Sequence, residues 1–338
     1  DFSSPAIFCF NADMAASVKF RLTATTSVSV TTGNENPSPP SSPMNACRNG
    51  SISTVPPNTR HTYQSCSSAV TMDGFETRAI AKLTDDGMIR SIDHVTSESP
   101  LSIVVNSAKH GRHELGITMR TPGNDRFLSI GFIYSEGIIS STEQIQDVEV
   151  GENIVEIALS DGALFDPSEH CRISTVTSSC GICGRANISD VLTERNEELD
   201  ERMRIRLETV TKCLNSVLER QLVFSKTGGS HACASFTSDG DIERVFEDVG
   251  RHNAFDKLVG SYIEEGGGAQ SVLGAFVSGR ASFELVQKSI RAGFPIMIAV
   301  GAPSTLAVDL AKEYGLTLGC FAKNESITLF SGVRRVME

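Results

Sequence analysis

The sequence predicts an α/β protein with an N-terminal α+β domain and a second, three-layer α/β/α domain built on a mostly parallel sheet. Two observations predict this class. Short β-compatible runs separated by turn residues dominate residues 78–177. Over residues 272–321, strand and helix patterns then alternate, which implies parallel strands joined by right-handed crossovers, with helices covering the sheet.

Length and composition fit this class and exclude others. The chain has 338 residues, 40% of them hydrophobic and 21% charged, so an ordinary core can form and general disorder is excluded. On a soft prior of roughly 150 residues per domain, this length is enough for two domains. The net charge of −11 argues against a protein that coats nucleic acid. No apolar run approaches the roughly 18 residues of a membrane-spanning helix, so we expect neither nucleic acid nor a membrane as a partner.

Residues 1–75 differ in composition from the rest of the chain. Ser, Thr and Pro are abundant there and aliphatic side chains are few, so little burial is available to offset the entropy of ordering. We predict a disordered leader. A Ser/Thr-rich, acid-poor leader is also typical of an organellar transit peptide, which leaves the location open between the cytoplasm and an organelle.

The first domain is predicted to span residues 76–186. An Asp-Asp-Gly turn signal separates its first two strands. Apolar residues recur at helical spacing over 125–135, and Gly137 lies just past the end of this predicted helix. The predicted strands cover residues 78–83, 88–95, 101–106, 115–119, 154–159 and 172–177.

A charged helical connection is predicted at 187–220, followed by the α/β domain at 221–338. In that domain Ser304 can cap one helix, and Gly293 and Gly315 follow the ends of two helices. The predicted helices cover residues 254–259, closing at Gly260, 282–291 and 305–314. The predicted strands cover residues 272–277, 295–300 and 316–321.

One pair of cysteines is candidate catalytic machinery. Of the nine cysteines only Cys180 and Cys183 are closely spaced, which is typical of reduced thiols with one reactive pair and not of a disulfide framework. Arg185 and a predicted helix start follow, and positive charge and helix N–H groups lower the pKa of a thiol. A thiolate can attack a sulfane sulfur and carry it as a persulfide.

Other interpretations of the pair compete with this one. A structural zinc site needs four ligands, which His170 with Cys171, or His231 with Cys233, could complete, so zinc stays open. A thioredoxin-like redox pair usually lies at the start of a helix in a βαβ unit. β-rich sequence precedes this pair instead, which argues against a redox pair of that kind. A structural disulfide is disfavoured in a reducing compartment. The sequence argues against zinc deamination, because Ser179 replaces the proline of the deaminase signature and no His-x-Glu occurs.

The carboxyl ends of the predicted parallel strands form a candidate ligand-binding rim. They fall on residues 278–280, 301–303 and 322–323, where small residues allow close approach and Arg280 and Lys323 add positive charge. An anionic ligand would fit there. The alternative is that these are only the tight loops that a parallel sheet needs.

A polar run at 247–253 precedes the helix predicted at 254–259. Arg251 and His252 together before a helix N-terminus would form a clamp for phosphate or carboxylate, which a plain helix cap does not require. The alternative is an ordinary cap and turn. We interpret His231, in the Gly-rich turn upstream, as structural.

These motifs together resemble the formate dehydrogenase accessory sulfurtransferase family (FdhD). The likeness covers about residues 78–330, leaves the leader outside, and is most specific over the eleven residues at 247–257. The runs that carry it are Cys-Gly-Ile-Cys-Gly at 180–184, Glu-Asp-Val-Gly-Arg-His-Asn-Ala-Phe-Asp-Lys at 247–257 and Ser-Gly-Arg-Ala-Ser-Phe-Glu at 278–284.

The resemblance implies a cytidine-deaminase-like fold for the second domain and a sulfurtransferase activity. Such proteins take sulfur from a cysteine desulfurase and pass it to the molybdenum bis(molybdopterin guanine dinucleotide) cofactor destined for the formate dehydrogenase apoenzyme. The persulfide carrier of the family falls on Cys180, and Cys183 matches the second cysteine. A cytoplasmic homodimer without a structural metal is the expectation that follows.

The resemblance also implies a cofactor-binding segment just after the last predicted strand. Two guanine dinucleotides bring several phosphate charges. Their desolvation would be offset by backbone N–H groups or by the side chains of Arg251, His252, Arg280 and Lys323. We expect the cofactor to bind the second domain, with Cys180 reaching it from the junction between the domains. The alternative is a non-catalytic chaperone that only holds the cofactor. The segment comprises Phe321, Ala322, Lys323, Asn324, Glu325 and Ser326; family members often end it with Gly and Arg, so the last two residues here remove a cation and add an acid.

Overall fold

The computed structural model describes most of one compact unit, Cys66–Glu338. Nearly all of the predicted leader at 1–75 lies outside the described residues, as does the predicted strand at 172–177. Residues 187–198 of the predicted helical connection also lie outside them. The described residues are 74–171, 199, 202–266 and 274–337.

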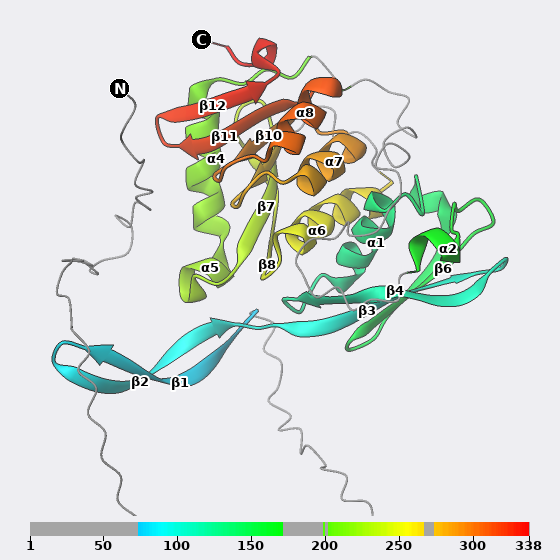
Figure 1. Ribbon diagram of the computed structural model, residues 1–338, viewed down its shortest axis with the longest axis horizontal. Helices are drawn as coiled ribbons and strands as arrows, with labels where there is room; N and C mark the ends of the chain where they lie inside the picture. Colours follow the sequence, from blue (N-terminus) through cyan, green and yellow to red (C-terminus); the bar gives the residue numbers. More distant parts are fainter. Residues whose placement is uncertain (1–73, 172–198, 200–201, 267–273, 338) are drawn as a thin grey trace, which may run out of the picture. The chain divides into compact units, whose positions relative to one another are not determined.

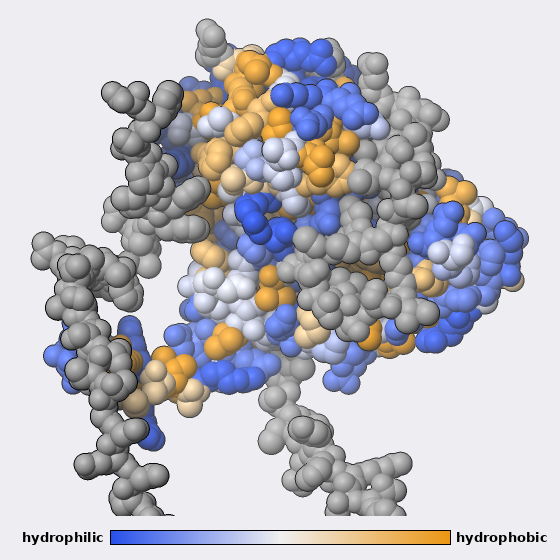
Figure 2. Space-filling model, viewed as in Figure 1, coloured by the Kyte–Doolittle hydropathy of each residue, from blue (hydrophilic) through white to orange (hydrophobic). Residues whose placement is uncertain are grey.

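A two-stranded antiparallel hairpin comes first, as the sequence predicts. It consists of β1 (Phe75–Thr84) and β2 (Gly87–Thr96), joined by the Asp-Asp-Gly turn. Leu83 and Met88 are paired across the strands and are 79% and 68% exposed, so one face of the hairpin presents apolar side chains to solvent (Figure 2). An isolated hairpin is only marginally stable. This hairpin packs against α5 (Leu222–Thr227), and that contact stabilises it.

A four-stranded sheet with the order β4-β3-β6-β5 follows (Figure 1). β3 and β6 pair in parallel, and the outer strands are antiparallel to them. Leu101, Ile103 and Val105 of β3 point alternate side chains into the core, as the period of a half-buried strand requires. The strands are β3 (Ser99–Ser107), β4 (Gly111–Arg120), β5 (Ile145–Val150) and β6 (Ile154–Leu159), and α1 (Asp125–Ser135) and the short α2 (Pro167–His170) complete this part.

A six-stranded sheet with the order β12-β11-β10-β9-β7-β8 forms the second half of the unit. The predicted parallel pairing is confirmed for β9, β10 and β11. The sequence did not predict the three flanking strands. β12 pairs antiparallel with β11, β7 with β9, and β8 with β7, so the complete sheet is mixed. The strands are β7 (His231–Phe236), β8 (Ile242–Asp248), β9 (Gly274–Val277), β10 (Ile296–Ala299), β11 (Thr317–Lys323) and β12 (Ser326–Ser331).

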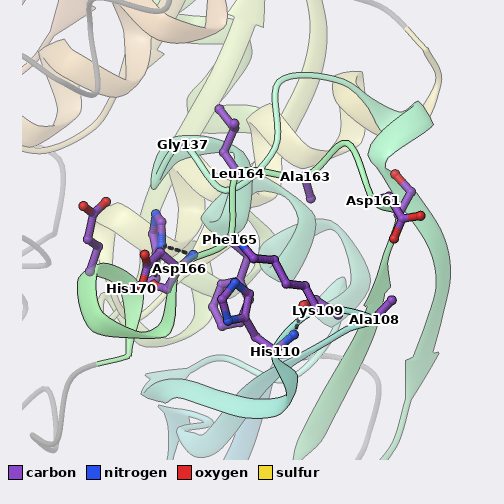
Figure 3. A pocket seen from close by; sticks show the side chains of 13 residues that line it. Ala108, Lys109, His110, Gly137, Asp161, Ala163, Leu164, Phe165, Asp166 and His170 are labelled. Carbon is purple, nitrogen blue, oxygen red and sulfur yellow. Dashed lines mark hydrogen bonds between the residues drawn. The ribbon is translucent and has the colours of Figure 1, made fainter.

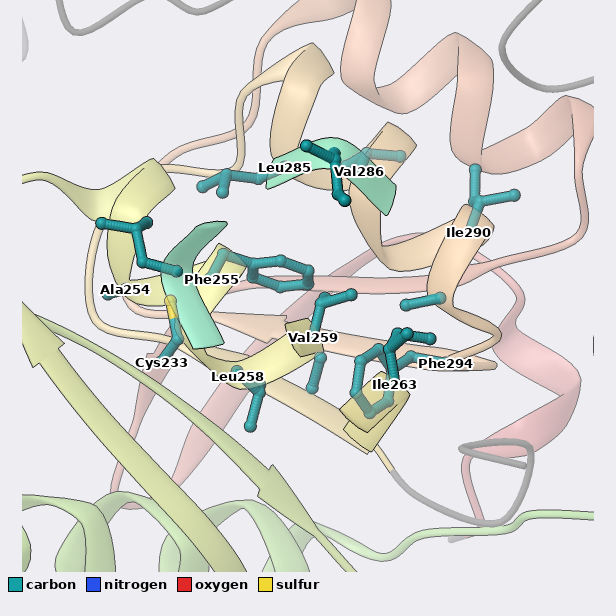
Figure 4. Packing of buried hydrophobic residues seen from close by; sticks show 14 of the residues in the cluster. Cys233, Ala254, Phe255, Leu258, Val259, Ile263, Leu285, Val286, Ile290 and Phe294 are labelled. Atoms are coloured by element: carbon teal, nitrogen blue, oxygen red, sulfur yellow. The ribbon is translucent and has the colours of Figure 1, made fainter. Parts of the chain in front are cut away.

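Helices cover both faces of this sheet, which gives the three layers that the sequence predicts. On one face, α6 (Arg251–Glu264), α7 (Phe283–Ala292) and α8 (Thr305–Glu313) bury apolar side chains. Figure 4 shows those of α6 and α7. On the other face, α4 (Leu207–Arg220) packs on alternate residues of the same strands. The likeness of this part to cytidine deaminases stays a prediction.

Two glycines bring α1 and α6 into direct backbone contact. A Cβ atom on Gly131 would lie 1.9 Å from the carbonyl oxygen of Asp256, and one on Gly260 would lie 1.9 Å from that of Phe127. The prediction that the helix closes at Gly260 is therefore wrong: α6 continues to Glu264 because the glycine serves helix packing and not a helix end.

The α1–α6 contact joins the two sheets through one hydrophobic core. Residues of β3, β6 and α1 belong to the same cluster as residues of α6, α7 and the central strands. The predicted domain at 76–186 thus contains the hairpin and the four-stranded sheet, and that at 221–338 contains the six-stranded sheet. All three sheets belong to one compact unit, and the division into separate domains stays a prediction.

Of the connection predicted to be helical at 187–220, the structure describes residues 199 and 202–220. There α4 confirms the helical prediction from Leu207 to Arg220, whereas Ile205 forms a parallel bridge with Val336. Within the described ranges, none of the helices has the length and apolar character needed to cross a membrane.

Candidate functional site

The carboxyl ends of β9, β10 and β11 meet at one edge of the six-stranded sheet, as expected of parallel strands. Backbone hydrogen bonds connect the loops that follow these strands. The Gly301 N–H donates to the Gly279 carbonyl at 2.9 Å, and the Phe321 N–H donates to the Gly301 carbonyl at 3.3 Å. A Cβ atom on Gly301 would lie 2.8 Å from the Gly279 oxygen, so only glycine fits there. We call this edge, with the side chains that lie on it, the rim.

Two basic side chains from other elements lie over the same rim. β7 runs antiparallel to β9, so its first residue, His231, lies beside the end of β9. α6 begins at Arg251, directly after β8. A Cβ atom on Gly279 would lie 3.4 Å from His231 Nδ1 and 3.7 Å from Arg251 Cδ, which places both side chains against this glycine.

The basic groups of the rim have no acidic partner among the described residues. Arg280 is exposed and enters no described ion pair. Arg251 Nε is shielded from solvent, and no described acceptor reaches it. Burial, together with the positive charges of Arg251 and Arg280, lowers the pKa of His231 below its ordinary value. A cluster of this kind is electrostatically suited to an anion.

His252 lies differently from the predicted clamp. Its Nε2 atom is 3.0 Å from Glu284 Oε2 and 3.2 Å from Ser282 Oγ, and the residue is only 9% exposed. The imidazole of His252 therefore contacts side chains at the start of α7. Of the predicted Arg–His clamp, only Arg251 lies on the rim.

The rest of the polar run at 247–257 is a buried structural network. Asp248 is completely buried and pairs with Lys257 Nζ at 2.8 Å. Its carboxylate also accepts hydrogen bonds from the backbone N–H groups of Thr121 and Gly250 and from the Asn253 amide. Burial raises the pKa of Asp248, and the Lys257 charge opposes this effect.

This network connects the two sheets. Lys257 Nζ donates to the Thr121 carbonyl at 2.9 Å, and Asn253 Nδ2 donates to the Met119 carbonyl at 2.7 Å. Deeper in the core, Asp256 pairs with Lys288 and accepts a hydrogen bond from Ser135 Oγ at 2.9 Å. Much of the run is thus used to hold β4, α1 and α6 together.

The predicted cofactor segment begins at the rim and continues into a hairpin turn. Phe321 has a left-handed backbone with φ of 54° and lies at a break in the pairing of β11 with β12. A bulky residue rarely adopts this conformation, so the segment carries local strain. Ala322 is buried, and the backbone oxygen of Asn324 accepts a hydrogen bond from Thr211 of α4. The side chains exposed to solvent are those of Phe321, Lys323, Asn324, Glu325 and Ser326.

The predicted carriers Cys180 and Cys183 lie outside the described residues. Burial raises the pKa of Cys213 and of Cys320 to about 12 and raises that of Cys233 well above its ordinary value. The pKa of half-buried Cys171 is also raised. None of the cysteines in the described ranges is thus an activated thiolate. Nor do the described residues contain a cluster of three or more His, Cys, Asp or Glu able to hold a metal.

A separate cavity of about 640 Å³ lies at the four-stranded sheet, between the β3–β4 turn and α2 (Figure 3). Phe165, 5% exposed, forms ring contacts with His110, His113 and His170. His170, a candidate zinc ligand in the sequence, lines this cavity, whereas the predicted cofactor-binding residues do not.

Sequence reasoning placed Arg251 and Arg280 at the rim and treated His231 as structural. The missed signal was topological: a strand antiparallel to β9 must begin where β9 ends. Recognising residues 231–236 as a strand would therefore have brought His231 to the rim.

The model of the FdhD/NarQ family matches residues 96–337 of the chain. Curated relatives of similar length also match. A protein named sulfur carrier protein FdhD from Streptomyces avermitilis is 39% identical over 275 residues, which cover 77% of this chain and 95% of that protein. The protein of the same name from Thermoplasma acidophilum is 39% identical over 271 residues, covering 78% and 93%.

A solved structure shares the fold. The crystal structure of a protein described as a formate dehydrogenase accessory protein from Desulfotalea psychrophila superposes with a TM-score of 0.63. It is 22% identical and covers 78% of this chain and 99% of that chain.

Proposed function

Because the chain belongs to the FdhD/NarQ family, we propose that it is a sulfur carrier that serves the maturation of formate dehydrogenase. The name shared by its curated relatives supports the carrier role. The observation from the molecule itself that supports it best is the rim, where His231, Arg251 and Arg280 lie without an acidic partner among the described residues.

The carrier group in this proposal is the thiolate of Cys180. It attacks the outer sulfur of a persulfide on a cysteine desulfurase, the sulfur–sulfur bond of the donor breaks, and the donor thiolate leaves. Cys180 then carries the outer sulfur as its own persulfide. The raised pKa values of the described cysteines make them poor nucleophiles, which supports assigning this role to Cys180.

The acceptor is the molybdenum bis(molybdopterin guanine dinucleotide) cofactor, which is cargo and not a resident group. Its pyrophosphate groups would lie at the rim, where Arg251 and Arg280 supply positive charge and the loops supply backbone N–H groups. The segment from Phe321 to Ser326 would line one side of this site. In the last step of the proposed function the outer sulfur would pass to the reduced metal, which would supply the electron pair of the new bond, and the Cys180 thiolate would be released.

Mass spectrometry tests the carrier step. The intact protein is incubated with a cysteine desulfurase and cysteine; the wild type is expected to gain one sulfur atom and Cys180→Ala to gain none. Cys171→Ala, which removes a half-buried thiol with a raised pKa, is the matched control and should behave as the wild type. Sulfur addition that is undiminished in Cys180→Ala overturns the assignment.

The non-catalytic chaperone is distinguished by a second measurement. Cells that lack the native protein are supplied with either Cys180→Ala or Arg251→Ala, and the formate dehydrogenase activity that each variant restores is measured. A carrier requires both residues. A chaperone that only holds the cofactor would retain activity with Cys180→Ala and lose it with Arg251→Ala.

A further inference from the structure

His231 is the basic group of the rim whose charge can change near neutral pH. Arginine side chains remain charged, whereas an imidazole titrates in this range. His231 is half-buried, and no described side chain accepts or donates a hydrogen bond to its ring. Its protonation state therefore depends on the charges around it.

The groups that face His231 come from three elements. Arg251 and His252 lie at the start of α6, and Arg280 follows β9; all three charges oppose protonation. Asp248, at the end of β8, favours protonation, but it is paired with Lys257. Positive charge and burial outweigh this single carboxylate, so the pKa of His231 is lowered in the free protein.

The neighbouring carboxylate of Glu247 is also engaged. It accepts hydrogen bonds from Ser230 Oγ at 2.7 Å and from the backbone N–H groups of Val223 and Phe224, both at 2.8 Å. It therefore anchors α5 and the turn before β7. The described surroundings leave His231 without a counter-ion of its own.

We propose that His231 takes up a proton from solvent when the pyrophosphate of a dinucleotide binds at the rim beside Arg251 and Arg280. This inference rests on the proposed function, because it concerns the same site. The phosphate charges offset the two arginines that oppose protonation, and the imidazolium then donates a hydrogen bond to the ligand. Binding of the ligand and protonation of His231 stabilise each other by linkage.

The sign of the pH dependence follows from this linkage. The free protein has the lower pKa at His231 and the complex the higher one, so the proton is taken up at pH values between the two. Affinity is therefore greatest on the acid side of this window and falls as the pH rises through it. Each unit by which the ligand raises the pKa corresponds to about a tenfold change in affinity.

Calorimetry on the full chain tests the coupling. The probe is diguanosine pyrophosphate, whose two phosphates each carry one negative charge that does not titrate near neutral pH. Binding is measured at several values from about pH 5 to about pH 8, in pairs of buffers with different ionisation enthalpies. The wild type is expected to take up a proton on binding and to lose affinity at higher pH.

Variants separate the outcomes. His231→Gln and His231→Asn are expected to bind with little proton uptake and a flat pH profile, whereas His94→Gln, on the hairpin, keeps both effects. Undiminished uptake in the two His231 variants overturns the inference while leaving the proposed function intact. Unchanged binding in both Arg251→Gln and Arg280→Gln instead removes the rim as the ligand site, and the proposed cofactor placement fails with it.

Discussion

The carboxylate of Asp248 shows how much of a conspicuous sequence run serves stability. It is buried, paired with Lys257, and hydrogen-bonded to two backbone N–H groups and one amide. A buried carboxylate left without its partner is costly, because the desolvation of the charge is no longer offset. The run at 247–257 thus contributes Arg251 to the rim, and its neighbours Asp248 and Lys257 stabilise the fold beneath the rim.

Removing one member of this ion pair should destabilise the protein strongly. Lys257→Met keeps the length of the side chain but leaves Asp248 buried alone, and we expect a loss of about 3–5 kcal/mol in the free energy of unfolding. Denaturant titration measures it. Arg78→Met, which breaks the exposed pair with Glu76, should cost less than about 1 kcal/mol. Equal losses in the two variants would contradict the structural role.

His231 should also make the stability of the free protein depend on pH. Its pKa is lowered in the folded state, so on acidification the unfolded chain binds the proton first. The free energy of unfolding should therefore decrease between about pH 7 and about pH 5, by about 1.4 kcal/mol for each unit of the shift. Denaturant titrations at both pH values should show a smaller decrease for His231→Gln than for the wild type. An identical decrease would mean that His231 carries no shift.

The residue scale also shows where sequence reasoning stops. Arg251 and Arg280 could be placed at the rim because strand ends and helix starts are local patterns. The orientation of His252 could not, since it is set by Glu284, which lies on a different helix. The polar run at 247–257 contains residues that lie on the rim and residues that are held by contacts inside the fold. No local sequence signal distinguishes the two.

At the scale of elements, the contact of α1 with α6 depends on two glycines. An added methyl group at either position meets a backbone carbonyl at 1.9 Å, and the backbone cannot move aside cheaply. We expect Gly131→Ala and Gly260→Ala each to lower the free energy of unfolding by about 1–3 kcal/mol or more.

Thermal unfolding of a third glycine variant provides the control. Gly162 lies outside regular structure, and a Cβ atom there would meet its nearest neighbour at 3.9 Å. Gly162→Ala should leave the melting temperature nearly unchanged. If Gly260→Ala behaves in the same way, the two helices are not in the close contact described.

The elements that sequence reasoning recovered are those with a strong local pattern. The hairpin β1–β2, helix α1 and the run from β9 to β11 have clear turn signals, caps or alternation. β5 has only two buried or half-buried apolar residues, and β12 lies at a sheet edge with little buried surface. Such edge strands are defined mainly by the neighbour they pair with, which a single sequence does not reveal.

At the scale of the whole molecule, the two sheets share one core and one polar network. Leu128 and Ile133 of α1 belong to the same hydrophobic cluster as Phe255 and Leu258 of α6. Separating the halves would expose this cluster and break the bonds from Lys257 to the first half. The unit is therefore expected to unfold in a single transition.

Fragments test this cooperativity. Residues 74–171 and 202–338, produced separately, are each expected to lack a sharp unfolding transition and to bind a hydrophobic dye. Mixing them should restore part of the near-ultraviolet dichroism if the shared core can re-form. A sharp transition in either fragment alone would instead support two autonomous domains.

The polar network of Asp248, Asn253 and Lys257 has a consequence for how descendants of this protein diverge. Selection on folding alone would retain these residues in a lineage whose reactive thiol had been lost, because the scaffold would collapse without them. Genome surveys that recognise members by this run therefore recover an architecture, and pseudoenzymes would be collected together with working carriers. Under the proposed function, sorting the two requires the residues at positions equivalent to 180 and 183.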